Sequence, residues 1–285
     1  MTGNQTRPLR ARAGWQGWRH MVAAAVAGAG LLAWPALSWG FAGIFDASTQ
    51  KALQGIGGSL MDAKPPAPAL PSVSGMAPRG RGGEAAGEKP VAKADAGAGA
   101  RGDAQADAGA FKYSQRVSAQ VRDDVIQELV NLGKRNGGLD AAGEKQLREA
   151  LGKVDIAKSI GGALQAKGYP QHSLATATAF WLVVNYEIVH GVQATDTQNA
   201  AVLRQMQQRM AATSDVARMS DAQKQRAAEG MMWFATLQHQ HNEQARQGAP
   251  GYALQTVQAD AREALKTFGI DADQLKLTDQ GLVPR

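Results

Sequence analysis

The sequence predicts an all-α protein, an irregular bundle of about six to seven helices that follows a signal peptide and a disordered linker. Two observations lead to this prediction. From residue 111 onward, apolar residues recur at helical spacing, which is typical of helices that bury one face. Capping residues, glycines and prolines divide this stretch into segments with short connections, and alternating strand patterns are nearly absent.

Residues 1–40 are typical of a secretory signal peptide. An uncharged stretch from Met21 to Phe45, rich in Ala and Gly, ends in small residues that favour cleavage after residue 38, 40 or 42. Four basic residues precede it: Arg7, Arg10, Arg12 and Arg19. The alternative is an uncleaved anchor, because about 20 apolar residues suffice to span a bilayer. Pro35 and the weak hydrophobicity favour cleavage. We therefore expect a periplasmic or secreted protein, with an inner-membrane anchor facing the periplasm as the alternative.

Composition excludes several classes of function. The formal charge falls from +6 to +2 without the four signal arginines, and no basic run interleaved with aromatics indicates a nucleic-acid partner. The chain has no cysteine, which excludes disulfides, thiolate catalysis and Cys-ligated zinc.

Two segments separate the signal from the predicted bundle. Residues 41–62 form a short amphipathic segment, which either docks on the bundle or serves as a spacer. Gly55, Gly57 and Gly58 weaken a helix there by roughly 1 kcal/mol each, which favours the spacer. Residues 63–110 are rich in Ala, Gly and Pro and nearly free of aromatic residues, so we expect a disordered linker.

Residues 111–285 are predicted to form one helical domain. Ser220 and Gln223 match a capping box, and the segment 174–190, apolar nearly all round, is expected to be the buried central helix. After the helices, Leu275 and Leu277 alternate before a turn. The expected helices cover residues 114–137, 140–151, 155–168, 174–190, 197–212, 220–248 and 252–268.

The domain resembles an uncharacterised helical domain found in exported bacterial proteins. The resemblance covers residues 111–281 and implies the fold, but it implies no activity, ligand or catalytic residue. Three motifs support it: Phe111-Lys112-Tyr113-Ser114 with Val117, Ala179-Phe180-Trp181-Leu182-Val183-Val184-Asn185, and Leu275-Lys276-Leu277-Thr278-Asp279-Gln280-Gly281.

Glu187 and His190 are the candidate metal ligands, because they interrupt the most apolar helix and share one face of it. Glu-x-x-His is one element of carboxylate metal sites in helical bundles, which need a second copy and two further Glu. The chain has a single copy here, so His239 or His241 would have to complete the site. The favoured interpretation is that His190 stabilises the helix end before Gly191.

Other candidate chemistry is weaker still. His239 and His241 point to different sides of a regular helix and look like part of a solvated helix end. Met206 and Met210 suit Cu(I), but methionines at this spacing more often fill a core. No Gly-x-Ser-x-Gly motif, cysteine or phosphate-binding loop is present. We expect a protein that is not an enzyme and needs no cofactor.

The favoured function is therefore an exported protein-interaction or scaffold module with another periplasmic or envelope protein as partner. Trp181, Trp233 and Phe234 are expected to border its binding groove. The alternatives are a periplasmic metal-binding protein or metal-dependent enzyme using Glu187 and His190, and a carrier of a small apolar ligand. The sequence leaves open the oligomeric state and whether Leu282-Val283-Pro284-Arg285 is native or a protease-tag remnant.

Overall fold

The computed structural model describes residues 45–62 and 107–285. The predicted signal peptide and nearly all of the predicted linker lie outside these residues. The described elements are α2 (Ala47–Met61), α3 (Gln115–Arg135), α4 (Ala141–Leu151), a π-helix (Ala157–Gly161), α5 (Gly162–Gln165), α6 (Leu174–His190), α7 (Asp196–Ala212), α8 (Ser214–Arg218), α9 (Asp221–Arg246), α10 (Leu254–Thr267), a 3-10 turn (Ala272–Gln274), β1 (Leu275–Thr278) and β2 (Gly281–Pro284).

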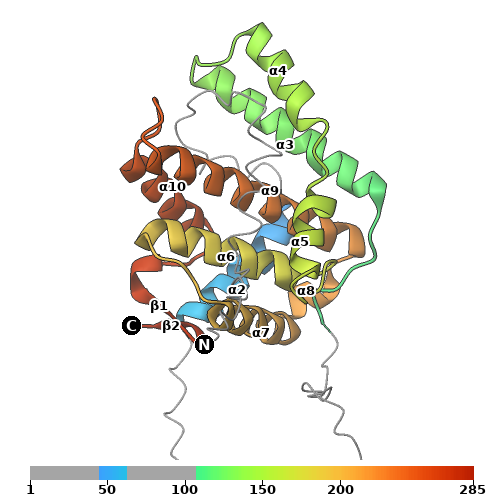
Figure 1. The fold of residues 1–285 in the computed structure, drawn as a ribbon. Helices are drawn as coiled ribbons and strands as arrows, with labels where there is room; N and C mark the ends of the chain where they lie inside the picture. The colour runs from blue at the N-terminus through green and yellow to red at the C-terminus, as the bar shows by residue number, and fades with distance from the viewer. Residues whose placement is uncertain (1–44, 63–106) are drawn as a thin grey trace, which may run out of the picture. The chain divides into compact units, whose positions relative to one another are not determined.

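The predicted all-α architecture is confirmed, with α6 and α9 packed against each other at its centre (Figure 1). Of the residues of α6, all but Glu187 and His190 are buried. Helix α9 is likewise buried without interruption from Ala227 to Asn242. Helices α7 and α10 pack on α6, while α3 and α10 pack on α9. Two helices buried on all sides therefore form the core of the fold, with the remaining elements around them.

The predicted helix starts agree with the observed caps. The hydroxyl of Ser173 accepts a hydrogen bond from the amide of Thr176 at 3.2 Å, and Ser220 forms the expected capping box with Gln223. Ser114 occupies a cap position without a side-chain cap bond. Its backbone is held instead by the Gln225 carboxamide, which accepts from the Ser114 amide and donates to its carbonyl, both at 2.8 Å. A side chain of α9 thus fixes the start of α3.

The alternating segment near the end of the chain is a strand. β1 and β2 pair antiparallel, with Leu277 opposite Leu282 and Thr278 opposite Gly281. Gly281 has φ of +105°, a conformation that favours glycine. Leu282 is 1% exposed, and β2 packs on α2 and α7. The hairpin is therefore an integral part of the core.

The segment expected to be a spacer is the core helix α2. Its apolar face is buried, and the ring of Phe45 lies 6.2 Å from the ring of Phe268 in an edge-on contact. The carboxylate of Asp46 caps the helix, and hydrogen bonds from the Ser48 hydroxyl and the Thr49 amide lower the pKa of Asp46 to about 2. The spacer interpretation is wrong because burial of this face outweighs the weak helix propensity of the glycines.

Helix α2 belongs to the same compact unit as residues 107–285. Residues 63–106 thus join two elements of one unit rather than linking the unit to something else. The chain re-enters the domain at residues 107–111, where Gly109 and Ala110 lie beside the start of α6. The carbonyl of Gly109 accepts from the amide of Leu174 at 2.9 Å, and the amide of Phe111 donates to the carbonyl of His172 at 3.1 Å.

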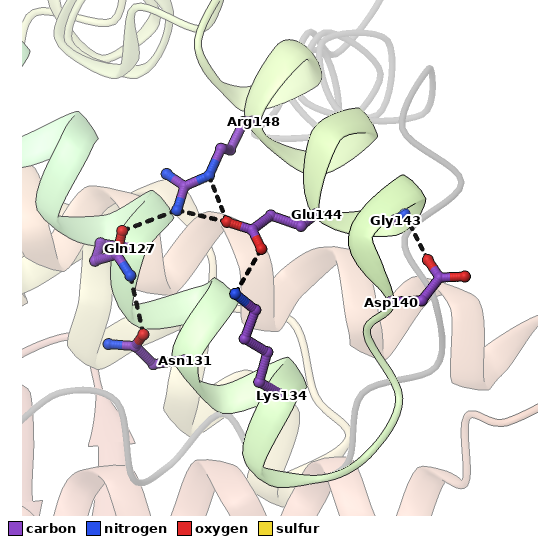
Figure 2. A network of polar contacts seen from close by, with 7 residues as sticks. All are labelled: Gln127, Asn131, Lys134, Asp140, Gly143, Glu144 and Arg148. Carbon is purple, nitrogen blue, oxygen red and sulfur yellow. Dashed lines mark hydrogen bonds and ion pairs between the residues drawn. The ribbon is translucent and has the colours of Figure 1, made fainter.

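Helix α4 packs on α3 through a network of polar side chains (Figure 2). Glu144 lies between Lys134, whose ammonium is 2.6 Å away, and Arg148, which also donates to Gln127 at 2.9 Å. These two cations, Lys134 first, lower the pKa of Glu144. The network joins α4 to the C-terminal half of α3. It adds to the burial of Leu147 and Leu151, the two buried residues of α4.

None of the helices in residues 45–62 and 107–285 combines the length and hydrophobicity needed to cross a membrane.

The tight contact between α2 and Phe268 predicts unequal effects at neighbouring glycines. A Cβ at Gly57 would lie 1.8 Å from the carbonyl oxygen of Phe268, whereas a Cβ at Gly55 or Gly58 would have no neighbour within 4 Å. We expect Gly57→Ala to destabilise the protein by about 2–3 kcal/mol in urea unfolding. Gly55→Ala, the matched control, should stabilise it by up to about 1 kcal/mol. Equal effects of the two substitutions would contradict the docking of α2.

Candidate functional site

Glu187 and His190 hold chain segments to the end of α6. The Glu187 carboxylate accepts a hydrogen bond from the amide of Ala194 at 2.7 Å, which fixes the loop between α6 and α7. The Nε2 atom of His190 lies 3.2 Å from the carbonyl oxygen of Ala272 and donates to it, while the ring packs at 4.4 Å on the ring of Tyr186. Both side chains therefore have structural partners.

The ligands needed to complete a metal site with these two residues do not assemble in the described part of the chain. Within residues 45–62 and 107–285, no three His, Cys, Asp or Glu side chains form a group that could hold a metal ion. His239 and His241 lie on α9, which packs on α6, yet neither joins Glu187 and His190 in such a group. The metal hypothesis remains a prediction that this geometry does not favour.

The aromatic residues expected to border a groove are core residues. Trp181, Trp233 and Phe234 are at most 1% exposed. The ring of Trp181 packs edge-on against the ring of Phe268 at 4.9 Å. A partner cannot contact these side chains while the domain is folded, because all three are buried in the core.

The expected solvated end of the sixth predicted helix is also buried. His239 and His241 are only 4% and 7% exposed, and the Gln and Asn residues around them are buried as well. The polar sequence was misleading because α3, α6 and α10 all pack on α9. Met206 and Met210 are fully buried, so they contribute to the core as their spacing indicated.

His241 and Glu229 are two of the buried titratable groups on α9. Burial lowers the pKa of His241 to about 4, and its ring contacts the ring of Tyr252 edge-on at 5.2 Å. Glu229 is 2% exposed, and burial raises its pKa despite the opposing effect of the Gln225 carboxamide, which donates to it at 2.8 Å. Both groups therefore favour their neutral forms in the folded protein.

The described surface contains one candidate binding site that sequence analysis did not find. It is a depression of about 510 Å³ between the end of α6, the start of α7 and the β hairpin, which we call the hairpin groove. This volume falls within the usual range of ligand pockets. Its lining residues are Tyr186, Val192, Gln193, Gln198, Lys276, Leu277 and Arg285.

Backbone and side-chain contacts hold the groove in shape. The hydroxyl of Tyr186 accepts from the amide of Leu277 at 3.1 Å, which joins α6 to the outer edge of β1. Gln198 closes the capping box of α7 with Thr195. The Nε atom of Arg285 donates to the carbonyl of Leu275 at 2.9 Å, which orients the guanidinium at the hairpin. The walls of the groove are therefore connected by hydrogen bonds rather than formed by isolated surface side chains.

The groove is lined by two cationic side chains and by apolar ones. Lys276 and Arg285 both lie at its rim, and neither takes part in an ion pair with another described residue. Val192 is 44% exposed and is among the few large apolar side chains exposed on the described surface. These groups suit an anionic ligand that also carries apolar surface.

No sequence motif pointed to the groove because three separated segments supply its residues. Tyr186 is adjacent in sequence to the candidate ligand Glu187, but Lys276 is on β1 and Arg285 directly follows β2, at the other end of the domain sequence. Each of these residues looks like ordinary surface when considered alone.

The lowered pKa of His241 predicts a loss of stability in acid. The unfolded state takes up a proton near pH 6.5, whereas the folded state resists protonation until about pH 4. This contribution to stability is complete above pH 6.5 and is lost as the pH falls toward 4. The free energy of unfolding of the wild type should be lower at pH 5 than at pH 7. We expect urea unfolding to show that His241→Gln reduces this difference by roughly 2 kcal/mol. An unchanged pH dependence in the variant would contradict this role.

The raised pKa of Glu229 predicts the opposite pH dependence, a loss of stability as the pH rises. The unfolded state releases its proton at a lower pH than the folded state does, so stability falls as the pH rises through this interval. Glu229→Gln keeps the acceptor for Gln225 without the charge, so the variant should equal wild type in acid and exceed its stability at pH 7. Thermal unfolding at both pH values provides the measurement. A variant that is less stable at both would show that the carboxylate itself is needed.

Comparison with known proteins places the chain in a family without assigning an activity. No curated protein and no solved structure matches it. One family model matches residues 22–285, which include α2, the whole bundle and the hairpin. Leu282 to Arg285 lie within this match and Leu282 is buried, so these residues are part of the domain rather than a tag remnant. The chain is a member of DUF6683, a family of unknown function.

Proposed function

We propose that the chain is an exported, non-enzymatic interaction module that binds an acidic segment of another envelope protein in the hairpin groove. The main support is that two cationic side chains, Lys276 and Arg285, line the same groove as the exposed apolar side chain of Val192. Neither cation forms an ion pair with another described residue. Charge complementarity of this kind selects a partner and accelerates association.

The small number of cations in the groove favours a protein partner over a nucleic acid. Two cations are too few for the phosphate contacts that dominate nucleic-acid binding. An acidic polypeptide needs only a few carboxylates, and its apolar side chains can contact Val192 and Leu277. The proposal thus assigns the carboxylates to the rim and the apolar side chains to the floor.

Export is supported by the sequence of residues 1–45, in which basic residues precede a long uncharged stretch. Phe45, the last residue of that stretch, is buried against Phe268. A chain cleaved at the predicted positions would therefore begin directly before its folded domain. An uncleaved anchor would hold the domain within a few residues of the membrane surface.

The proposal predicts a binding defect from reversal of one charge. We expect a short fluorescent peptide containing glutamate and leucine to bind wild-type protein in an anisotropy titration, with affinity that falls as salt is added. Lys276→Glu should weaken binding roughly tenfold or more, since it replaces a favourable charge contact with a repulsive one. The matched control is Lys112→Glu, which reverses an exposed lysine at the start of the domain.

Equal loss of binding in both variants would mean that net charge alone attracts the peptide, which would contradict a specific groove. In cells, a photo-crosslinking residue at Val192 should capture the same acidic partner, and Lys276→Glu should abolish the capture. Tyr113 is the control position, because it is similarly exposed and stacks on His172 just before α6, whereas Val192 follows the other end of that helix. Capture from both positions, or from neither, would reject the assignment.

A further inference from the structure

Helix α2 is held in the domain by one buried face and by non-covalent contacts. Its buried residues include Leu53, Ile56 and Leu60, and the helix packs on α7, α8, α9 and β2. Residues 267–270, at the end of α10, also contact it. We call this surface, formed by α7, α8, α9, β2 and residues 267–270, the α2 seat. No ion pair joins α2 to another of the described elements.

The α2 seat fits α2 by shape more than by charge. Gly57 lies so near the carbonyl oxygen of Phe268 that a Cβ there would be 1.8 Å from it. The carboxamide of Gln54 donates a hydrogen bond to the carbonyl of Thr267 at 3.3 Å. An apolar helix face placed in a fitted groove is a recurring mode of protein recognition. The seat therefore has the properties of a binding site for this particular helix.

The covalent connection between α2 and the rest of the domain is long. It runs through residues 63–106, and a chain of this length spans at most about 150 Å. A compact domain of the size formed by residues 107–285 is about 40 Å across. The connection is therefore long enough to reach the α2 seat of an adjacent copy as well as the seat of its own chain.

Helix α2 depends on a seat for its helical structure. Gly55, Gly57 and Gly58 weaken the helix, and a helix of this length is marginal in water without packing. When α2 leaves its seat, its apolar face and the apolar surface beneath it are both uncovered. A second copy of the chain presents the same two surfaces, and they fit each other across chains as closely as within one chain.

We propose that the α2 seat binds α2 of a second copy of this chain, so that two copies exchange α2 reciprocally and form a dimer. The exchange needs no new interface, because the contacts that hold α2 are those described above, supplied by the other chain. The connection within one chain gives α2 an effective concentration on the order of 1 mM at its own seat. Monomers therefore predominate in dilute solution, and exchanged dimers form as the protein concentration approaches that value.

Cysteine crosslinking between two copies of the full chain tests the exchange, because the native chain has no cysteine. One copy carries Gln54→Cys and the other carries Thr267→Cys, at two positions that are in contact across the seat. The copies are unfolded in urea, refolded together and treated with a short bismaleimide. We expect crosslinked heterodimers after refolding at about 1 mM and at least tenfold fewer at about 10 μM. Absence of heterodimers at both concentrations would overturn the proposal.

The matched control for random collision is Lys145→Cys in place of Thr267→Cys. Lys145 has an exposed side chain on α4, an element that packs on α3. The proposal expects few crosslinks between Gln54→Cys and Lys145→Cys at either concentration. Equal crosslinking to both positions would show that the copies only collide, and would reject the exchange.

The glycines of α2 provide a second control, placed in the copy that carries Gln54→Cys. Gly57→Ala clashes with the carbonyl of Phe268, so it should remove the crosslink between chains. Gly55→Ala meets no neighbouring atom within 4 Å and should leave the crosslink intact. Crosslinking that survives both substitutions would show contact between the chains outside the α2 seat, and would overturn the exchange.

Discussion

The contact between α6 and α9 is the interaction on which the other described elements depend. Both helices are buried over most of their circumference, so each needs neighbours on every side. Helix α7 and α10 cover α6, and α3 and α10 cover α9. Without cysteines, the domain has no disulfide to support this arrangement, and burial of the two central helices must provide most of its stability.

The packing of α6 against α9 also explains why most of the candidate binding residues named from the sequence do not line a binding site. A helix that is surrounded on all sides buries its polar residues together with its apolar ones. Trp181 and Trp233 were attractive as binding residues because they are large, but large aromatic side chains stabilise most when they are fully buried. The residues left for binding are those that several segments bring to the surface, as at Lys276 and Arg285.

Much of the fold could be predicted from local signals. The caps at Ser173 and Ser220 and the apolar run of α6 depend on neighbouring residues, so the sequence pattern contains them. Burial of His239 and His241 could not be predicted, because it depends on helices distant in sequence. The docking of α2 could not be predicted for a similar reason. In the sequence Gly57 only weakens a helix, whereas in the structure it allows close packing against the carbonyl of Phe268, a residue distant in sequence. The hairpin groove likewise exists only in the assembled domain.

The position of α2 has a consequence for the order in which the chain becomes native. This helix leaves the ribosome before the rest of the domain, yet its partners include Phe268, Ile270 and β2 near the other end of the sequence. Contacts this distant in sequence form slowly and late. The domain therefore cannot close during emergence of the chain. The contacts of α2 are therefore complete only after nearly all of the chain has been synthesised.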